Sequence, residues 1–467
     1  MKKLPDLKQL SDEAKDALIV ELWQEIQKLR AALTTDESKP DSSPAKTSSN
    51  SSTPPSKGFK PNIGPSKIEG LKRQKSLGRA GGGRYLHPEP DQIIIAQIKS
   101  CPQCGETVTA RAQKLQSVYD KIELPPIRPI VSRIERYGGH CACCQTDYLA
   151  PVPAGMEPGS PFGREIQSLV TYLRYTHAIG YERLSGILSE VFGLKISEGA
   201  IANLLGTVKT SLDDQVNQIL QRLRQAKLIC SDETSARVNG KNQWEWVFQN
   251  QDICLHVIRP SRGAGVISSV LGEHRPQVWV SDLFSAQKNH PAAQWQVCLA
   301  HQLRDCQYAI DAGDRIFAPA MKRLLLRAFV IHRRRDRMDE TKLERYRSNL
   351  RERLTRILSL APHQPDGVRL RKRYGELMDN LFLFLEDVTT PPTNNSSEQA
   401  IRMSVIFRRV TNCFRSEWGR DLFAAVRSVV NTGKRQGLTA YQAIQQALSI
   451  HGPLFSPGRA ITISFPN

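Results

Sequence analysis

The stretch from residue 228 to residue 248, LICSDETSARVNGKNQWEWVF, holds two apolar runs separated by Asn239-Gly240. The first run, Leu228–Cys230, leads into Ser231 and Asp232, and the second is Trp244–Phe248. Asn-Gly is typical of the two-residue turn of a β-hairpin. Because a third apolar run follows at Ile253–Ile258, the stretch predicts three consecutive strands in an antiparallel meander.

The chain after the meander alternates between helix and strand. A helix is expected around Ala264–Leu271, strands at Gln277–Asp282 and Gln296–Ala300, and a further helix from His301. A meander followed by this alternation is the order of an RNase H-like domain. Asp232 and Asp282 both fall at the carboxyl ends of predicted strands, where open α/β sheets gather their active sites.

Two strand-end aspartates suit phosphoryl transfer on nucleic acid, which uses oxygen ligands to hold two Mg²⁺ or Mn²⁺ ions. A third acid is needed. Glu398 is the candidate, because Thr393–Arg402 has the pattern of a capped helix start with the glutamate in its first turn. From the residues alone, these acids are equally consistent with turn residues or solvent-exposed residues that bind no metal. Glu233 is an alternative metal ligand to Asp232.

Ten cysteines in a chain without an export signal are expected to stay reduced, so paired cysteines indicate metal binding. Two C-x2-C pairs lie in the segment 85–155, which we interpret as a module holding structural Zn²⁺ through four thiolates. The four predicted ligands are Cys101, Cys104, Cys141 and Cys144. Cys143 and His140 compete as ligands, and chance clustering is the alternative.

The N-terminal segment 1–33 has the apolar spacing of a short coiled coil and predicts a homo-oligomer, although a helix docked on its own domain has the same pattern. Residues 34–84 are rich in Ser, Pro, Lys and Gly and are expected to form a disordered basic linker. The region 156–226 is predicted to be helical, and Tyr181–Val208 has helix-turn-helix spacing. This spacing favours DNA binding, with plain helix packing as the alternative.

The chain of 467 residues carries 65 Lys and Arg against 46 Asp and Glu, a formal charge of +19 that indicates a polyanionic partner. No apolar stretch reaches the length of a membrane span, so we expect a cytoplasmic protein without membrane contact. Basic residues follow Glu398, and they are candidates for binding phosphates. The predicted DNA-binding residues are Arg402, Arg408, Arg409 and Arg415. Arg402, one turn after Glu398, is equally suited to pair with that carboxylate.

Several segments together resemble the DDE transposases of the insertion-sequence sixty-six family. They are Asp232–Thr234, Cys298–Arg304, Asn394–Arg402, the two cysteine pairs and Asn50–Ser56. The chain differs from the family pattern at Leu283–Ser285 after the second acid, at Gln399, and at Gly81–Arg84, but the three acids are in place.

The resemblance implies a multidomain α/β protein with an RNase H-like catalytic domain, formed by residues 227–304 and 388–450, around a helical insertion at 305–387. The coiled coil, the zinc-binding module and the helical DNA-binding region precede it, and a tail at 451–467 follows. Asp232, Asp282 and Glu398 would be the catalytic, Mg²⁺-binding triad. His301 and Arg304 are candidate supporting residues, and for His301 a direct role and a structural hydrogen bond both remain open.

The function implied is that of a bacterial insertion-sequence transposase, associated with the nucleoid when bound to DNA. It would bind terminal inverted repeats, cleave DNA with Mg²⁺ and join the 3′-OH to target DNA, and accessory proteins of the same element are candidate partners. A nuclease of the same fold without joining activity, and an inactive DNA-binding protein, are the alternatives.

Overall fold

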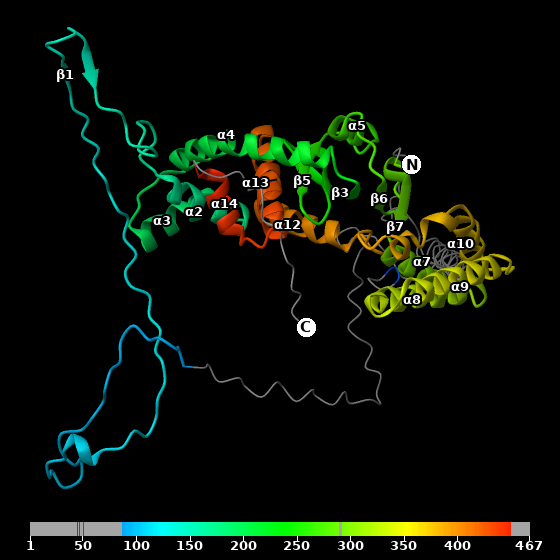
Figure 1. Cartoon of the computed structure of the whole chain (residues 1–467), viewed down its shortest axis with the longest axis horizontal. Helices are drawn as coiled ribbons and strands as arrows, with labels where there is room; N and C mark the ends of the chain where they lie inside the picture. The colour runs from blue at the N-terminus through cyan, green and yellow to red at the C-terminus, as the bar shows by residue number, and fades with distance from the viewer. Residues whose placement is uncertain (1–43, 45, 47–49, 51–85, 289–291, 450–467) are drawn as a thin grey trace, which may run out of the picture. The chain divides into compact units, whose positions relative to one another are not determined.

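The computed structural model describes residues 44, 46, 50, 86–288 and 292–449, drawn in colour in Figure 1. The predicted coiled coil, the C-terminal tail and nearly all of the linker lie outside the described residues. The described chain divides into two compact units. The larger one contains residues 44, 46 and 50, Val152–Tyr181 and the residues from Gly199 on, and the smaller one contains residues 86–151 and Glu182–Glu198. Within the described ranges, no helix has the length and apolar character to cross a membrane.

A five-stranded mixed sheet in the order β5-β4-β3-β6-β7 lies at the centre of the larger unit. Three strands form the predicted antiparallel meander, and two further strands run parallel to β3. The strands are β3 (Leu228–Val238), β4 (Lys241–Gln249), β5 (Cys254–Arg259), β6 (Val278–Ser281) and β7 (Gln294–Val297). Asn239 and Gly240 form the turn between β3 and β4, both with positive φ. Helices α5 (Gly265–Leu271) and α6 (Ser285–Lys288) supply the alternation that the sequence predicts.

Strand β3 is longer than the sequence predicts. It does not end at Cys230 but continues to Val238, because its second half pairs with β4 across the hairpin. The parallel pairing with β6 covers only Leu228–Cys230. Asp232 therefore lies within β3, just past the point where the parallel neighbour stops.

Helices cover the sheet and its edge (Figure 1). Helix α13 (Glu417–Arg435) lies along the edge strand β5, where Thr432 Oγ1 accepts from the backbone N–H of Cys254 at 3.1 Å and Ser428 Oγ from that of His256 at 2.8 Å. These bonds satisfy donors that an open edge would leave exposed. The remaining helices of this part are α2 (Arg164–Tyr175), α4 (Glu198–Leu223), α12 (Asn395–Thr411) and α14 (Ala440–Leu448).

The segment between β7 and α12 is helical, and its first helix begins at Leu299, two residues before the predicted start. The helices are α7 (Leu299–Asp311), α8 (Phe317–Arg333), α9 (Glu340–Leu358), α10 (Pro365–Glu376) and α11 (Leu383–Glu386). Their apolar core includes Phe317, Leu350 and Tyr374, and it also takes in Val297 at the end of β7 and Leu299 at the start of α7. The insertion and this edge of the sheet therefore share one core.

The smaller unit contains a short hairpin of β1 (Gly138–His140) and β2 (Asp147–Leu149), a 3-10 turn η2 (Ala110–Ala112), and most of α3 (Tyr181–Phe192). Helices α3 and α4 form where the helix-turn-helix pattern predicts them. The apolar residues predicted for the second helix, among them Ile201, Leu205 and Val208, are buried in α4.

Candidate active site

Asp232 lies within β3, and Asp282 directly follows the end of the neighbouring parallel strand β6. The register of β3 and β6 pairs Leu228 with Val278 and Cys230 with Val280. Continued by two residues, this register carries Asp232 and Asp282 toward each other on one face, because side chains alternate along a strand, and the charge of Asp282 acts on Asp232. Burial is the main cause that raises the pKa of Asp232 well above its ordinary value, and the charges of Glu233 and Asp282 add to it.

Helix α12 carries the third acid, Glu398, in its first turn, as the sequence predicts. One face of β4 holds this helix in place. Gln249 Nε2 donates to Ser397 Oγ at 2.9 Å, Val247 packs with Ala400 and Ile401, and Ser404 Oγ donates to Glu245 Oε1 at 2.6 Å. Alternate residues of β4, which share one face of the strand, thus contact successive turns of α12.

Asn394 ties the start of α12 to two other elements. Its side-chain amide donates to the carbonyl oxygen of Ser231 at 2.6 Å, and its backbone N–H donates to Cys298 Sγ at 3.1 Å. Its Oδ1 accepts from Ser397 Oγ at 2.6 Å. The side chain makes no helix-capping bond, unlike the capped start that the sequence suggests, because it is engaged with β3. Asn394 therefore sets the position of Glu398 relative to Asp232.

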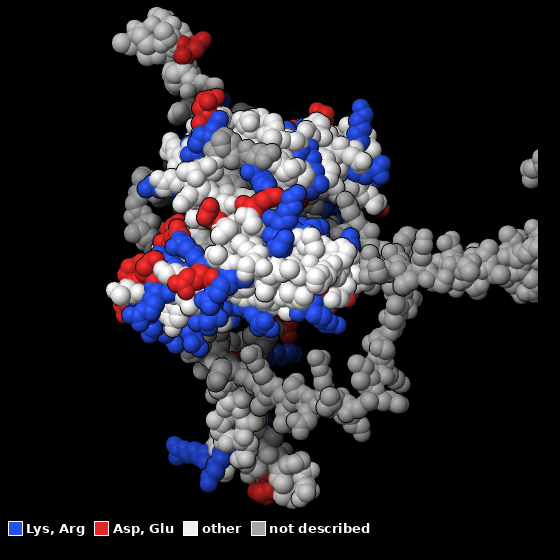
Figure 2. All heavy atoms as spheres, turned by 90° about the vertical axis from the view of Figure 1, so that its right-hand side faces the viewer, with Lys and Arg blue, Asp and Glu red and all other residues white. Residues whose placement is uncertain are grey.

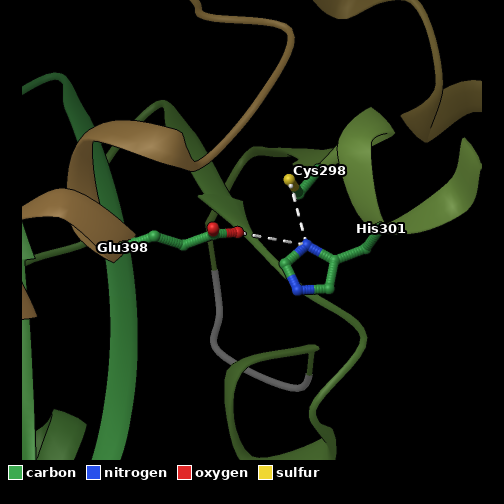
Figure 3. A group of neighbouring side chains, drawn as sticks. All are labelled: Cys298, His301 and Glu398. Carbon is green, nitrogen blue, oxygen red and sulfur yellow. Dashed lines mark hydrogen bonds and ion pairs between the residues drawn. The ribbon is translucent and has the colours of Figure 1, made fainter. Parts of the chain in front are cut away.

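Cys298, His301 and Glu398 point toward one another from α7 and α12 (Figure 3). His301 Nδ1 lies 3.2 Å from Cys298 Sγ and 3.7 Å from Glu398 Oε1. Burial lowers the pKa of His301, but the hydrogen bond to Cys298 and the Glu398 carboxylate outweigh it and raise the pKa to about 9. Arg304 Nη1 lies 3.9 Å from the same Oε1. His301 and Arg304 thus both lie at the site.

Glu233 is engaged on the other side of β3. Arg262 donates to its carboxylate at 2.6 and 3.1 Å, and Gln287 donates to its second oxygen. The Arg262 guanidinium carbon lies over the rings of Trp244, 4.6 Å from the ring centre, and of Phe284, 3.8 Å from the ring centre. Burial, with the charge of Asp282, raises the pKa of Glu233 despite these donors. These contacts leave Asp232 as the better placed of the two acids for a ligand role.

The site has the character of a cation-binding centre. Carboxylates gathered in a partly buried place repel one another, and the raised pKa of Asp232 follows from that repulsion together with burial. Among the described residues, no hydrogen-bond donor reaches the buried Glu398 Oε1, although His301 and Arg304 approach it at ion-pair distance. A divalent cation would satisfy that oxygen and reverse the repulsion. Hard oxygen ligands of this kind fit Mg²⁺ or Mn²⁺.

The predicted DNA-binding arginines differ in exposure. Arg402, Arg409 and Arg415 are exposed, whereas Arg408 is half-buried and donates to Thr234 Oγ1 on β3 at 3.2 Å. Burial lowers the pKa of Arg408. Among the described residues, the cations that approach Glu398 are His301 and Arg304, not Arg402.

Figure 2 shows the end of the molecule that carries the insertion helices, where Lys and Arg side chains lie among Asp and Glu. Several of these charges form ion pairs, such as Arg347 with Glu344 on α9 at 2.8 Å and Arg351 with Glu386 on α11. Much of the positive charge of the insertion is therefore matched by acids of the same segment.

The two cysteine pairs each form a tight knuckle of the same kind. The N–H of Gly105 donates to Cys101 O, and that of Gln145 donates to Cys141 O, both at 2.9 Å. Both ring nitrogens of His140 have other partners, Asp147 Oδ1 at 2.9 Å and Gln145 Oε1 at 3.1 Å. Within the described ranges, the four predicted zinc ligands are not gathered at one point; the group whose ligand atoms lie within 4.8 Å of one another is Cys298, His301 and Glu398.

Sequence reasoning did not single out Cys298, Asn394 and Gln249. Cys298 lies three residues before His301, and this one-turn spacing is a signal that could have paired them. Asn394 and Gln249 give no local signal, because their partners are 163 and 148 residues away along the chain.

The comparison with protein families agrees with this geometry. A family model described as "Transposase IS66 family" matches residues 159–421, more than half of the chain. A search among curated proteins found no match. The matched span contains the mixed sheet, the insertion and all three acids. The chain belongs to the IS66 family of DDE transposases.

Proposed function

We propose that this protein cuts and joins DNA at the ends of an insertion sequence, using Asp232, Asp282 and Glu398. The observation that carries the proposal is the parallel register of β3 and β6, with Asp232 just past the paired residues of β3 and Asp282 directly after β6, and with Glu398 on a helix that Asn394 ties to β3. Family membership supports a transposase role with DNA as partner. Binding of terminal inverted repeats, metal-dependent cleavage and strand transfer are the proposed steps.

The proposed fold of the catalytic domain is RNase H-like. Its support is the strand order β5-β4-β3-β6-β7, with three antiparallel strands followed by two parallel ones, and a helix, α5, between the two groups. In such sheets the active site forms where the parallel strands end. The first two acids of this chain lie at that place.

The three acids would hold Mg²⁺ or Mn²⁺, and bound metal would activate the attacking hydroxyl and stabilise the leaving oxygen. The other residues of the site orient these ligands. His301 and Arg304 both approach Glu398 Oε1, and Arg262 holds Glu233 away from the ligand set. Their roles are therefore those of positioning residues.

Exposed basic side chains on and after α12 suit the phosphates of the DNA strands that enter the site. Arg402 and Arg409 lie on the same helix as Glu398, and Arg415 follows it. Phosphate contacts position DNA without reading its sequence. Recognition of the inverted repeats is assigned to the helical region 156–226, and self-association to residues 1–33, with accessory proteins of the element as further partners.

Structural zinc in the smaller unit is a second part of the proposal. No residue from Leu86 to Pro151 is buried, so within this described segment no apolar core offsets the entropy of ordering the chain. Segments of this kind fold around metal. The two matched knuckles support Cys101, Cys104, Cys141 and Cys144 as the ligands.

Measuring zinc content shows which of the neighbouring residues Cys143 and Cys144 binds zinc. Cys144→Ser is expected to lose one equivalent of zinc relative to the unaltered chain, measured by elemental analysis of the purified protein. Cys143→Ser is the matched control and is expected to keep that equivalent. Equal zinc in both variants would contradict the four-thiolate site.

Strand-transfer assays on oligonucleotides bearing the element's ends test the proposed activity. Asp282→Asn and Glu398→Gln are expected to abolish both cleavage and joining, while Glu376→Gln, an acid on α10 outside the site, keeps them. Hydrolysed products without joined ones would indicate a nuclease. DNA binding without any metal-dependent product would indicate an inactive binding protein.

A further inference from the structure

Cys298, His301 and Glu398 have the spacing of a tetrahedral metal site. With ligand distances of about 2.3 Å for sulfur and about 2.0–2.2 Å for nitrogen and oxygen, neighbouring S and N ligands lie about 3.6 Å apart and N and O ligands about 3.4 Å apart. The observed separations from His301 Nδ1 are 3.2 Å to Cys298 Sγ and 3.7 Å to Glu398 Oε1. Both separations lie within about half an ångström of these values, and all three atoms lie within 4.8 Å of one another, so side-chain adjustments would bring them onto one ion.

The surroundings of this group match those of a metal ligand set. Cys298 Sγ accepts the backbone N–H of Asn394 at 3.1 Å and lies at the N-terminus of α7, and N–H donors of this kind commonly surround metal-bound sulfur. Glu398 Oε1 is buried, faces His301, and has no hydrogen-bond partner among the residues that the structure describes. Cys298 is buried, whereas the side chains of His301 and Glu398 are 19% and 33% exposed, so the group lies close enough to the surface for an ion to enter.

The ligand atoms of Cys298, His301 and Glu398 favour a different metal ion from the Mg²⁺ or Mn²⁺ that the three acids favour. A sulfur, an imidazole nitrogen and one carboxylate oxygen together favour Zn²⁺, whereas Mg²⁺ takes oxygen ligands only. Glu398 belongs to both sets, and a carboxylate oriented toward Cys298 and His301 is withdrawn from Asp232 and Asp282.

We propose that Cys298, His301 and Glu398 form a Zn²⁺ site that competes with the catalytic cation for Glu398 and inhibits DNA cleavage. Binding of Zn²⁺ rests on the geometry of these three side chains alone. The inhibition rests on the proposed function. A hydrogen bond from His301 to Cys298, with no metal, is the alternative explanation of the 3.2 Å contact.

Co²⁺ tests binding without any activity measurement, because a thiolate ligand gives Co²⁺ a charge-transfer absorption. The full-length chain is expected to show one more cobalt–thiolate contribution than Cys298→Ser. Cys306→Ser is the control, since Cys306 is also buried in α7 but contacts Tyr374 instead. The knuckle cysteines contribute equally to all three proteins. Identical cobalt spectra for the three proteins would overturn the site.

A second variant tests the site independently, in case Cys298→Ser does not fold. His301→Ala leaves the sulfur in place and is expected to weaken Co²⁺ binding at this site at least tenfold, with the circular dichroism of the unaltered chain. Undiminished Co²⁺ affinity in His301→Ala would also overturn the proposal.

Inhibition is measured by titrating Zn²⁺ into cleavage reactions at fixed Mg²⁺, each protein normalised to its own activity without zinc. Cys298→Ser is expected to need at least tenfold more Zn²⁺ for half-inhibition than Cys306→Ser. Equal half-inhibition would overturn the competition. Absence of Mg²⁺-dependent cleavage in every protein would instead contradict the proposed function, and the cobalt result would still decide the binding site.

Discussion

The side-chain amide of Asn394 donates a hydrogen bond to the carbonyl oxygen of Ser231 at 2.6 Å. Ser231 directly precedes Asp232, and Asn394 lies one helical turn before Glu398. One buried side chain thus fixes the distance between the strand of the first acid and the helix of the third.

Loss of this bond is expected to impair activity more than stability. Asn394→Ala leaves a buried carbonyl oxygen unpaired, at a cost of about 1–3 kcal/mol, and frees the start of α12 to move. We expect cleavage to fall at least tenfold and half-activation to require more Mg²⁺. Asn380→Ala is the control, because Asn380 also donates to a strand carbonyl, that of Trp295, at 2.9 Å. Equal losses of activity in the two variants would argue against a positioning role for Asn394.

Asp232→Asn is expected to stabilise the metal-free protein while abolishing cleavage. The folded chain raises the pKa of Asp232 above its ordinary value of 3.8, so it holds this proton more tightly than the unfolded chain does. The unfolding free energy therefore falls as pH rises between the ordinary and the raised pKa, by about 1.4 kcal/mol per unit of elevation.

Thermal unfolding in the presence of a chelator measures this effect. At neutral pH the variant is expected to unfold at the higher temperature, and the difference should vanish below the ordinary pKa of aspartate. Mg²⁺ should raise the unfolding temperature of the unaltered chain more than that of the variant. A variant that is less stable than the unaltered chain at neutral pH contradicts the burial of an uncompensated charge.

Arg262 and Glu233 are expected to show strong coupling in stability. Arg262→Ala leaves the nearly inaccessible Glu233 carboxylate with Gln287 as its remaining donor, and removes the cation that lies over the rings of Trp244 and Phe284. Because the Arg262 side chain is 41% exposed, we expect a loss of about 1–3 kcal/mol, below the range for fully buried pairs. Chemical denaturation of the two single variants and of Arg262→Ala with Glu233→Gln completes the cycle. Additive losses in the double variant would show that the pair is not coupled.

Substitution of Arg409 is expected to affect DNA binding, whereas substitution of its neighbour Arg408 is expected to affect stability. Arg409 is exposed, so Arg409→Ala is expected to weaken DNA binding for every sequence tested and to reduce the slope of log affinity against log salt by about 1. Arg408→Ala should instead lower the unfolding temperature, because Arg408 contacts Thr234 on β3. Fluorescence anisotropy at several salt concentrations gives the slope. An unchanged slope for Arg409→Ala would remove this residue from the DNA-binding surface.

The sequence predicted the sheet well because its signals are local. Asn239-Gly240 marks the hairpin, and each apolar run between 228 and 297 became a strand within a few residues of its predicted bounds. The predicted end of β3 was wrong, because pairing with β4 extends the strand through Asp232 and Glu233 to Val238. Alternation along a single chain cannot reveal how far a partner strand reaches.

The three candidate acids were chosen from local sequence patterns, but the contacts that surround them have no such pattern. Strand ends and a helix start pointed to Asp232, Asp282 and Glu398, as did the family resemblance. The contacts of Asn394 with Ser231, and of Gln249 with Ser397, join residues about 150 positions apart, and no local pattern encodes such pairs. The partners of His140 likewise became visible only in the folded hairpin of β1 and β2.

The shared core of the insertion and the sheet edge has a consequence for how this protein can be shortened. Val297 and Leu299 pack among the residues of α8, α9 and α10, and Cys298 lies between them in the chain. A deletion of residues 305–387 would expose the apolar side chains on both sides of Cys298 and loosen the segment that carries His301. The insertion thus supports the segment that carries Cys298 and His301, and a protein shortened at the insertion's sequence boundaries would lose that support.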